Sequence, residues 1–419
     1  MGKFGSGFLV GAATAAHQVE GNNINSDCWA LEHSSYGGYA EPSMDACDHY
    51  NRYEEDIRLM KEAGLNAYRF GIEWARIEPQ EGVFDEQALR HYEDMVSCCR
   101  KHGIEPVVTL HHFSSPVWLI RKGGWEAEST VDDFAAYARF VVGKLGKDLH
   151  YICTINEANM GIQIMSVARE FYNQMVADGK IQMGISMEAL MTGTPEKRKE
   201  NEKLFGTASP QVFQSPRTEN GDQIIMRAHR AACAEMKKIN PGIKTGLTLS
   251  LHDIQAVDGG EENAAKEWND EFLHYLPYIR EDDFLGVQNY SRSRYGKDGN
   301  LPVPEGAQVT QMGYEYYPQG LGNVLRKVAK EYKGELLVTE NGIATDNDEE
   351  RVNFIGAATD GVAACIGNGI DIKGYFYWSL LDNFEWQKGY GMKFGLIEVD
   401  RSGGQIRRPK PSLKYLGSI

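Results

Sequence analysis

Eight apolar, β-branched stretches recur along the chain, and this recurrence constrains the fold more than any other feature. The stretches cover residues 7–15, 66–74, 105–113, 151–158, 243–251, 282–290, 335–342 and 372–382. They are apolar along their whole length instead of alternating, which is typical of parallel strands that are covered on both faces. Patterns with helical periodicity lie between them. The sequence therefore predicts an α/β fold, a (β/α)8 TIM barrel.

An open doubly wound sheet is the structural alternative. That fold commonly carries G-x-G-x-x-G after its first strand, and no such pattern follows residues 7–15. We expect a single barrel domain over residues 1–419, with a loop or helical excursion around 159–242. The polar run GTPEKRKENEKLFGTASPQ lies within this interval.

The helical pattern after residue 85 is a clear example of the elements between the strands. One face of the predicted helix carries Leu89, Tyr92, Val96 and Cys99. Asp85 precedes the pattern as an N-cap and Gly103 ends it. The acidic run DACDHYNRYEED at 45–56 is expected to be a solvated helix start.

The net charge of the chain disfavours some classes of binding partner. Lys and Arg number 44 against 59 Asp and Glu, for a net charge of −15, which repels nucleic acid and anionic membranes. No run of 18 apolar residues predicts a membrane span.

The seven cysteines show no CxxC spacing, and we interpret them as reduced thiols of a cytoplasmic protein. The N-terminal segment resembles a short secretory signal, but a first β-strand accounts for it better.

Polar and aromatic residues follow most of the predicted strands. In a barrel of this type the carboxyl ends of the strands converge on one mouth, so these side chains are expected to share a cavity. They are Gln18, Glu20, Arg69, Glu73, His111, His112, Asn156, Glu157, Gln288, Asn289, Tyr290, Glu340, Asn341, Trp378, Asp382, Asn383, Glu385 and Trp386.

Two of these residues, Glu157 and Glu340, form the carboxyl pair that cleavage of a glycosidic bond requires. One acid protonates the leaving oxygen, while the other, ionised, attacks or stabilises the sugar carbon. A separation of about 5 to 5.5 Å gives retention of configuration, and about 6.5 to 9.5 Å gives inversion. If Arg69 and Tyr290 reach Glu340, they favour its charged form as nucleophile. Its charge then keeps Glu157 protonated as the acid.

Four segments carry a resemblance to a known family. YRFGIEWARIEPQEG, TINEA, LLVTENGIA and YFYWSLLDNFEWQKGYGMKFGLIEVD resemble glycoside hydrolase family 1, the retaining β-glucosidase and β-galactosidase family. The resemblance runs from GAATAAHQVEG to RRPKPSLKY, and TENG and NFEW are its most specific motifs. It implies a TIM-barrel β-glycosidase that needs no cofactor and no metal.

The resemblance also implies roles for individual residues. The catalytic group is Glu340 as nucleophile, Glu157 as acid/base, Asn156 at the sugar 2-hydroxyl, and Arg69 and Tyr290 beside the nucleophile. The substrate-binding group is Gln18, His112, Gln288, Glu385 and Trp386, with Trp378 as the platform beneath the sugar ring. Amide, imidazole and carboxylate groups suit hydroxyls, and aromatic faces suit the apolar face of a pyranose.

Departures from the family pattern bear on specificity. NEP is NEA here, Phe113 replaces a tryptophan, NYY is QNY, and Lys393 replaces an arginine. Glu385 stands where the phospho-sugar branch binds phosphate, so unphosphorylated sugars are expected. Glu157 is present, so O-glycosides are expected rather than thioglycosides.

Other functions compete with this one. A metal-dependent barrel enzyme would need clustered carboxylate ligands, which the sequence does not offer, and a sugar-binding or transglycosylating relative would hydrolyse little. His111 and His112 point to opposite sides of a strand, which disfavours a shared metal ion. Glu73 is expected to pair with a nearby arginine such as Arg76. The expected partner is a small β-glycoside or short oligosaccharide, with the choice of gluco, galacto or fuco and the oligomeric state left open.

Overall fold

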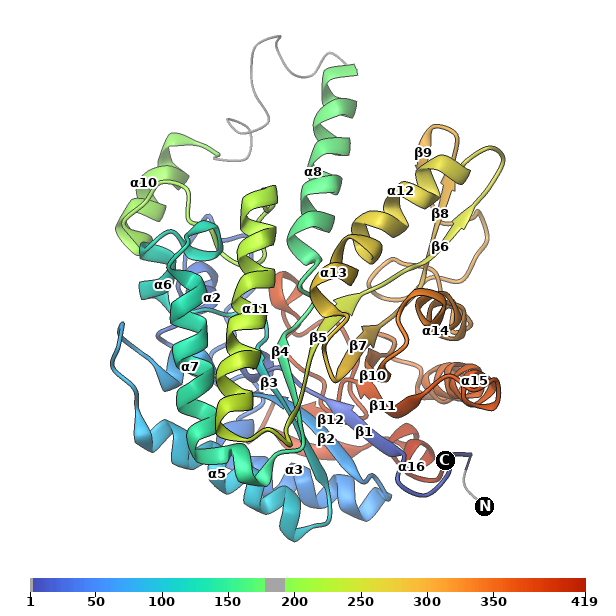
Figure 1. Ribbon diagram of the computed structural model, residues 1–419, viewed down its shortest axis with the longest axis horizontal. Coiled ribbons are helices and arrows are strands. Elements are labelled where there is room, and N and C mark those ends of the chain that lie inside the picture. Colours follow the sequence, from blue (N-terminus) through green and yellow to red (C-terminus); the bar gives the residue numbers. More distant parts are fainter. Residues whose placement is uncertain (1–2, 178–192) are drawn as a thin grey trace.

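Eight parallel strands close into a barrel in the computed structural model, which describes residues 3–177 and 193–419 (Figure 1). The barrel strands are β1 (Leu9–Ala13), β2 (Ala67–Gly71), β3 (Glu105–His111), β4 (Tyr151–Ile155), β5 (Lys244–Ser250), β7 (Phe284–Gln288), β10 (Glu335–Asn341) and β11 (Ile372–Trp378). Each strand pairs with the next one along the chain, and β1 closes the ring against β11 through Leu9 and Gly374. Every predicted stretch contains one barrel strand, so the predicted fold is confirmed.

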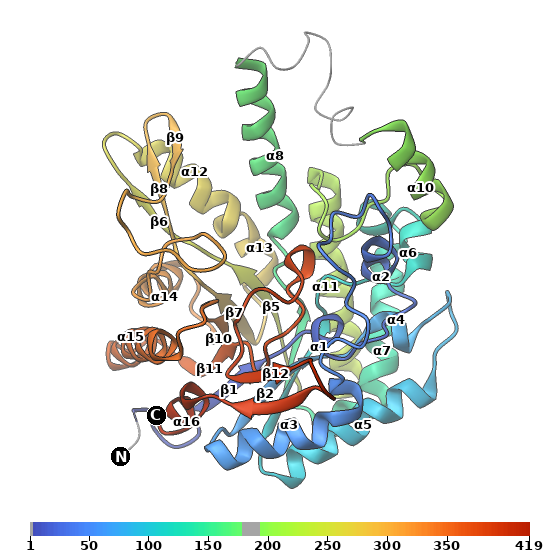
Figure 2. The ribbon, with the colours of Figure 1, turned by 180° about the vertical axis from the view of Figure 1, so that it is seen from behind.

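Helices cover the outside of the barrel and its mouth (Figures 1 and 2). They are α1 (Ala16–Val19), α2 (Asp27–Glu32), α3 (His49–Ala63), α4 (Trp74–Ile77), α5 (Glu86–Lys101), α6 (Val117–Arg121), α7 (Thr130–Leu145), α8 (Met160–Ala177), α10 (Pro195–Phe205), α11 (Glu219–Ile239), α12 (Glu261–Glu271), α13 (Leu276–Ile279), α14 (Gly320–Glu331), α15 (Asp348–Gly367) and α16 (Pro411–Gly417). Two small sheets accompany them: β6 (Asp253–Ala256), β8 (Arg292–Gly296) and β9 (Gly299–Leu301), and β12 (Ile397–Asp400) with β13 (Ile406–Pro409).

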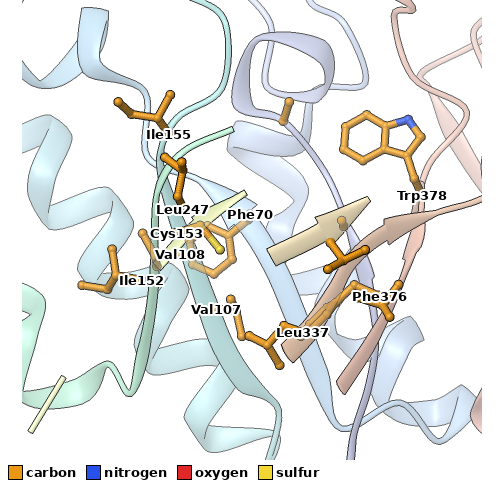
Figure 3. Close-up of a cluster of buried hydrophobic side chains, with 14 of the residues drawn as sticks. Phe70, Val107, Val108, Ile152, Cys153, Ile155, Leu247, Leu337, Phe376 and Trp378 are labelled. Carbon is orange, nitrogen blue, oxygen red and sulfur yellow. The ribbon is translucent and has the colours of Figure 1, made fainter. Parts of the chain in front are cut away.

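The barrel strands are buried on both faces, as their continuous apolar sequences predict. All five residues of β2 are buried. Phe70, Val107, Leu247, Leu337 and Phe376, contributed by five different strands, belong to one hydrophobic cluster and are at most 1% exposed (Figure 3). This packed cluster fills the barrel, so only the carboxyl ends of the strands can hold polar groups in a shared cavity.

Helix α5 forms as its sequence predicts. The side chain of Asp85 caps it by accepting hydrogen bonds from the backbone N–H groups of Gln87 and Ala88. The predicted apolar face, including Leu89, Tyr92, Val96 and Cys99, is buried. Gly103 follows the helix with φ of 65°, a left-handed conformation that glycine adopts without strain.

Helices α8 and α10 lie within the interval predicted for the excursion after β4. Helix α11, which falls inside the predicted interval, packs along α7 and belongs to the helical ring, because its long apolar face needs a partner surface. Helix α8 rises above the barrel mouth, and α10 lies apart from it (Figure 1). Residues 178–192 of the predicted excursion lie outside the described residues. A single domain over the whole chain stays a prediction, which the hydrogen bond from the Lys3 N–H to the Ile419 carbonyl supports (2.7 Å).

Candidate active site

The polar strand ends converge on a cavity of about 190 Å³ at the barrel mouth. Its lining residues are His112, Phe113, Glu157, Met160, Gln214, Tyr290, Met312, Tyr314, Glu340, Trp378, Glu385, Trp386 and Phe394. Seven of the eleven residues with a predicted catalytic or substrate-binding role are in this set. The other four, Gln18, Arg69, Asn156 and Gln288, are fully buried and do not line the cavity. Met160, Gln214, Met312, Tyr314 and Phe394 lie outside the barrel strands, and of these only Phe394 falls within a family-like segment of the sequence.

Glu340 is held by the two donors expected beside it. Its Oε1 accepts from Arg69 Nη1 and its Oε2 accepts from Tyr290 OH, each at 2.6 Å. Arg69 Nη1 also donates to the carbonyl of Thr339 at 3.2 Å. Both carboxylate oxygens are therefore fixed by donors that come from β2 and from the segment after β7.

Asn156 is oriented by three donors on one oxygen. Its Oδ1 accepts from Arg69 Nη2 (2.6 Å), Gln288 Nε2 (2.7 Å) and Thr248 Oγ1 (3.1 Å). Its amide nitrogen is thereby directed to His112, whose Nε2 accepts a hydrogen bond from it at 3.1 Å. Gln288 thus contacts Asn156, behind the cavity wall, instead of the cavity itself.

The two glutamates have different electrostatic surroundings. Burial and the negative charge of Glu340 raise the pKa of Glu157 to about 8, against the opposing charges of His252 and Arg69. Burial also raises the pKa of Glu340, but the charge of Arg69 and the hydrogen bonds from Tyr290 and Arg69 oppose that rise. These donors favour an ionised Glu340 beside a protonated Glu157. The pair can supply a nucleophile and a proton in the same cavity.

His112 is neutral in this environment. Burial and the charge of Arg69 lower its pKa well below the ordinary value. Since Nε2 accepts from Asn156, the proton resides on Nδ1, which has no hydrogen-bond partner among the described residues. His112 therefore keeps one unused donor, Nδ1, which is buried.

Glu385 presents a second buried carboxyl group. Its Oε2 accepts from Gln18 Nε2 (3.0 Å) and Asn383 Nδ2 (3.1 Å), and burial raises its pKa to about 7. Gln18 also donates to the carbonyl of Phe384 at 2.8 Å. The side chain of Gln18 thus connects α1 to the segment after β11 and positions Glu385.

Aromatic rings form one side of the cavity. The ring of His112 stacks on Trp378 and on Trp386, with centroid distances of 5.4 and 6.2 Å. Phe113 contacts Trp386 at 5.2 Å in a tilted arrangement. Such aromatic rings suit contact with the apolar face of a sugar ring.

Three lining residues have left-handed backbone conformations: Phe113 (φ 71°), Glu157 (φ 43°) and Trp386 (φ 42°). Such conformations are costly outside glycine and gather at functional sites. Gly342, directly after Glu340 and Asn341, meets a different constraint, because a Cβ there would lie 1.9 Å from the carbonyl oxygen of Trp378. The TENG motif therefore ends in glycine because β10 and β11 approach each other closely.

The prediction that Glu73 pairs with a nearby arginine such as Arg76 was wrong. Arg76 pairs with Glu20 (2.8 Å), whereas Glu73 accepts from Ser114 Oγ (2.6 Å) and caps α4. The reason is that Glu20 follows α1 and extends to Arg76, a contact between segments that no local pattern encodes.

Among the described residues, one group of His, Cys and Asp side chains could hold a metal ion, and it is separate from the predicted site. His229, Cys233 and Asp282 have ligand atoms within 4.8 Å of one another. His229 already bonds Thr154 Oγ1 (2.7 Å) and Asp282 (3.1 Å), as a satisfied core histidine does. None of the three lines the cavity.

Known proteins resemble this chain over its whole length. The profile described as glycosyl hydrolase family 1 matches residues 1–419. Beta-glucosidase A of Thermotoga maritima is 31% identical over 440 residues, covering 96% of this chain and 94% of that protein. A crystal structure of a β-glycosidase has a TM-score of 0.91 at 46% identity, covering 99% of this chain and 96% of that one. A β-glucosidase from Thermotoga maritima in complex with galacto-hydroximolactam has a TM-score of 0.81 at 26% identity, covering 100% and 98%.

The helices give no sign of a membrane span. None in the described part of the chain is long and apolar enough to cross a bilayer.

Proposed function

The chain belongs to glycosyl hydrolase family 1 and is a β-glycosidase, and from this premise we propose that it hydrolyses unphosphorylated β-O-glycosides with retention of configuration. The observation that carries the proposal is the pair Glu157 and Glu340, which line one cavity in different electrostatic surroundings. No cofactor enters the reaction, because the two carboxyl groups supply both the nucleophile and the proton.

The first step forms a glycosyl-enzyme. Glu340, kept ionised by Arg69 and Tyr290, attacks the anomeric carbon of the sugar. Glu157 donates its proton to the glycosidic oxygen as the bond to the leaving group breaks. The electron pair of that bond stays on the oxygen, and the leaving group departs as an alcohol.

The second step uses the same two groups in altered states. Once Glu340 is esterified its negative charge is gone, and the repulsion that raised the pKa of Glu157 disappears. Glu157 can then accept a proton from water, which attacks the anomeric carbon and releases Glu340. One chemical event thus switches Glu157 from acid to base.

Recognition of the sugar rests on the fixed polar groups around the cavity. Asn156 and His112 are assigned to the hydroxyls near the anomeric carbon, Glu385 with Gln18 behind it to the distant hydroxyls, and Trp378 to the ring face. A β-glucoside is the favoured substrate, since the named relative is a beta-glucosidase. A galactoside or fucoside stays an alternative, and a solved relative was captured with galacto-hydroximolactam.

A larger pocket is proposed for the leaving group. It has a volume of about 600 Å³, shares Gln214 with the catalytic cavity, and includes Tyr36, Tyr39 and Gln387 in its lining. Aromatic rings and amide groups suit a second sugar or an aryl group. Lys197 is the only charged residue among its lining residues, so anionic leaving groups are tolerated.

A phosphorylated sugar is disfavoured at this site. Glu385 lines the cavity, and its carboxylate would repel a phosphate once ionised.

The free state of all seven cysteines supports a reducing, cytoplasmic location.

The test is hydrolysis of nitrophenyl β-glucoside, followed by proton NMR, in buffer without added metal. We expect turnover in the presence of a chelator and the β-anomer as the first product. The α-anomer as first product would exclude retention. Transfer to alcohol acceptors without release of free sugar would favour the transglycosylating alternative.

A 2-fluoro sugar probe followed by peptide mass spectrometry tests the nucleophile. The label is expected on the peptide that contains Glu340. Label on another carboxyl group would overturn the proposed division of roles.

A further inference from the structure

His252 lies just beyond the carboxyl end of β5 and is tightly paired with Glu271, the last residue of α12. Its Nδ1 lies 2.6 Å from Glu271 Oε1, and its backbone N–H donates to Glu271 Oε2 at 2.9 Å. The side chain of Glu271 is 3% exposed, while that of His252 is 40% exposed. The carboxylate is therefore enclosed, and the imidazole reaches the mouth side of the molecule. Neither His252 nor Glu271 is one of the two carboxyl groups that carry out the proposed reaction.

The same carboxylate is tied to the segment that carries Glu157. Gln163 of α8 donates from Nε2 to Glu271 Oε1 and to the Ser250 carbonyl, each at 3.1 Å. Asn159 Nδ2 donates to the carbonyls of Ser250 (2.7 Å) and Glu271 (3.0 Å).

The backbone of the acid/base residue joins this network through β5. The Glu157 N–H donates to Thr248 Oγ1 at 3.0 Å, and the Ala158 N–H donates to the Thr248 carbonyl at 3.1 Å. The end of β5, the end of α12 and the start of α8 thus form one hydrogen-bonded unit. This unit fixes His252 relative to Glu157.

We propose that the His252–Glu271 pair is a positioning device for charge: a protonated His252, held by Glu271, places a fixed positive charge near Glu157 and eases release of its proton. The inference rests on the proposed function, because it concerns the acid/base residue of that reaction. It assigns a role to two residues that no sequence motif singled out.

The charges around both groups agree with this role. Glu157 faces the anions Glu340 and Glu385 and the cations Arg69 and His252. Arg69 donates from Nη1 to Glu340 and from Nη2 to Asn156, so its charge mainly compensates Glu340. His252 lowers the pKa of Glu157 more than Arg69 does.

His252 is itself surrounded by carboxylates. Partial enclosure of the imidazole by the protein lowers its pKa, but Glu271, Glu267 and Glu157 raise it to about 9. The contact with Glu271 at 2.6 Å thus favours the imidazolium form at neutral pH.

The reaction needs such a charge in its second step. Burial and the neighbouring anions favour protonated Glu157, which suits donation to the leaving group but not abstraction of a proton from water. A nearby cation favours the ionised form and brings the two states of Glu157 closer in free energy.

The experiment compares the pH dependence of kcat/KM for phenyl β-glucoside in the wild type and in His252→Gln, His252→Lys and Gln163→Ala. Loss of the cation in His252→Gln should move the basic limb of the kcat/KM profile to higher pH by about 0.5 unit. This is the effect expected of a unit charge at a distance on the order of 10 Å when the effective dielectric constant is about 40. His252→Lys keeps the charge and should keep the limb. Gln163→Ala loses only a neutral hydrogen bond and should also keep it.

A basic limb in His252→Gln that coincides with the wild type would overturn the proposal, as would an equal shift in His252→Lys or Gln163→Ala. NMR titration of the wild-type His252 gives a readout that needs neither activity nor a folded variant. A pKa of about 9 is expected, and a value of about 6.5 would refute the charged state. Failure of the proposed function would be distinct, since the wild type would then cleave no β-glycoside.

Discussion

Arg69 connects the two halves of the catalytic site at the level of single side chains. One nitrogen donates to Glu340 and the other to Asn156, so a single guanidinium orients both the proposed nucleophile and the amide assigned to the sugar 2-hydroxyl. The fork of donors in arginine makes this double contact possible, and lysine could not reproduce it. The charge and the geometry of the site are therefore set together.

Replacement of Glu340 by glycine tests the proposed nucleophile. Glu340→Gly should lower kcat for nitrophenyl β-glucoside by several orders of magnitude, because the covalent intermediate cannot form. Added azide should partly restore turnover and yield the α-glycosyl azide. The control Glu335→Gln changes a glutamate at the opposite end of the same strand and should retain activity. Undiminished activity in Glu340→Gly would contradict the assignment.

The pH dependence of kcat/KM should follow the two glutamates. Glu157 must be protonated to act as an acid, so activity should fall as the pH rises through about 8. Glu340 must be ionised, so activity should also fall at low pH, around a pKa raised above its ordinary value. Phenyl and dinitrophenyl β-glucosides provide the comparison. The dinitrophenyl substrate needs little proton donation and should show a weaker basic limb; identical basic limbs would argue against Glu157 as the acid.

The junction of β10 and β11 sets the geometry of the site at the level of elements. Glu340 and Asn341 end β10, Trp378 ends β11, and Gly342 is the point of close approach between them. The glycine of this local motif therefore reflects a tertiary constraint. Gly342 is required by the neighbouring strand β11, and not by the conformation of its own segment.

Gly342→Ala should damage both stability and activity. The added Cβ would lie 1.9 Å from the Trp378 carbonyl oxygen, so the strands must move apart and Trp378 must shift. We expect a loss of about 2 kcal/mol or more in the free energy of unfolding, and a lower kcat. The control Gly143→Ala, in α7 with open space around its Cβ position, should stabilise by about 0.5 to 1 kcal/mol. Thermal unfolding measures both variants, and equal melting temperatures would contradict the argument.

A buried ion pair joins distant parts of the chain at the level of the whole molecule. Asp56 of α3 and Arg407 of β13 are both fully buried, with Oδ1 accepting from Nε at 2.8 Å and Oδ2 from Nη2 at 2.9 Å. His49 also contacts Asp56, at 2.8 Å. The prediction of a solvated start for this helix was therefore wrong at His49 and Asp56, because the partner lies 351 positions away.

Arg407→Met should destabilise the protein by about 3 to 5 kcal/mol, because it leaves the Asp56 carboxylate buried without its partner. The neighbouring Arg408→Met removes exposed pairs with Glu398 and Asp400 and should cost at most about 1 kcal/mol. Burial opposes the pKa shift of Asp56, but Arg407 and His49 lower it overall. The stabilisation is thus present at neutral pH and lost as the pH falls through the folded pKa. Urea unfolding at neutral and acid pH checks both statements, and equal costs for the two variants would contradict them.

The sequence predicted the barrel and many of the residues that meet at its mouth. Each barrel strand reads as a buried strand from its own residues, and the carboxyl end of each strand is defined locally, so Glu157, Glu340, Trp378 and Glu385 could be assigned to one face of the fold. The parallel closed topology then brings them together without further information.

The hydrogen-bond partners of four predicted residues could not be read from the sequence. Gln18, Arg69, Asn156 and Gln288 are fully buried and bond to other side chains, and these contacts depend on rotamers and on the packing of segments that are distant in the sequence. The lining residues Met312, Tyr314 and Phe394 were missed, because they come from loops whose paths follow the packing of the whole molecule.

The sequence by itself thus determined the class of fold and the family, and it singled out the proposed glutamate pair, since strand patterns and strand ends are local properties. Only the tertiary structure decided that Gln288 positions Asn156, that Arg76 pairs with Glu20, and that His252 stands in a network with the acid/base segment. The physical reason is that hydrogen bonds and charges act through space, and the barrel places side by side residues that the chain keeps far apart.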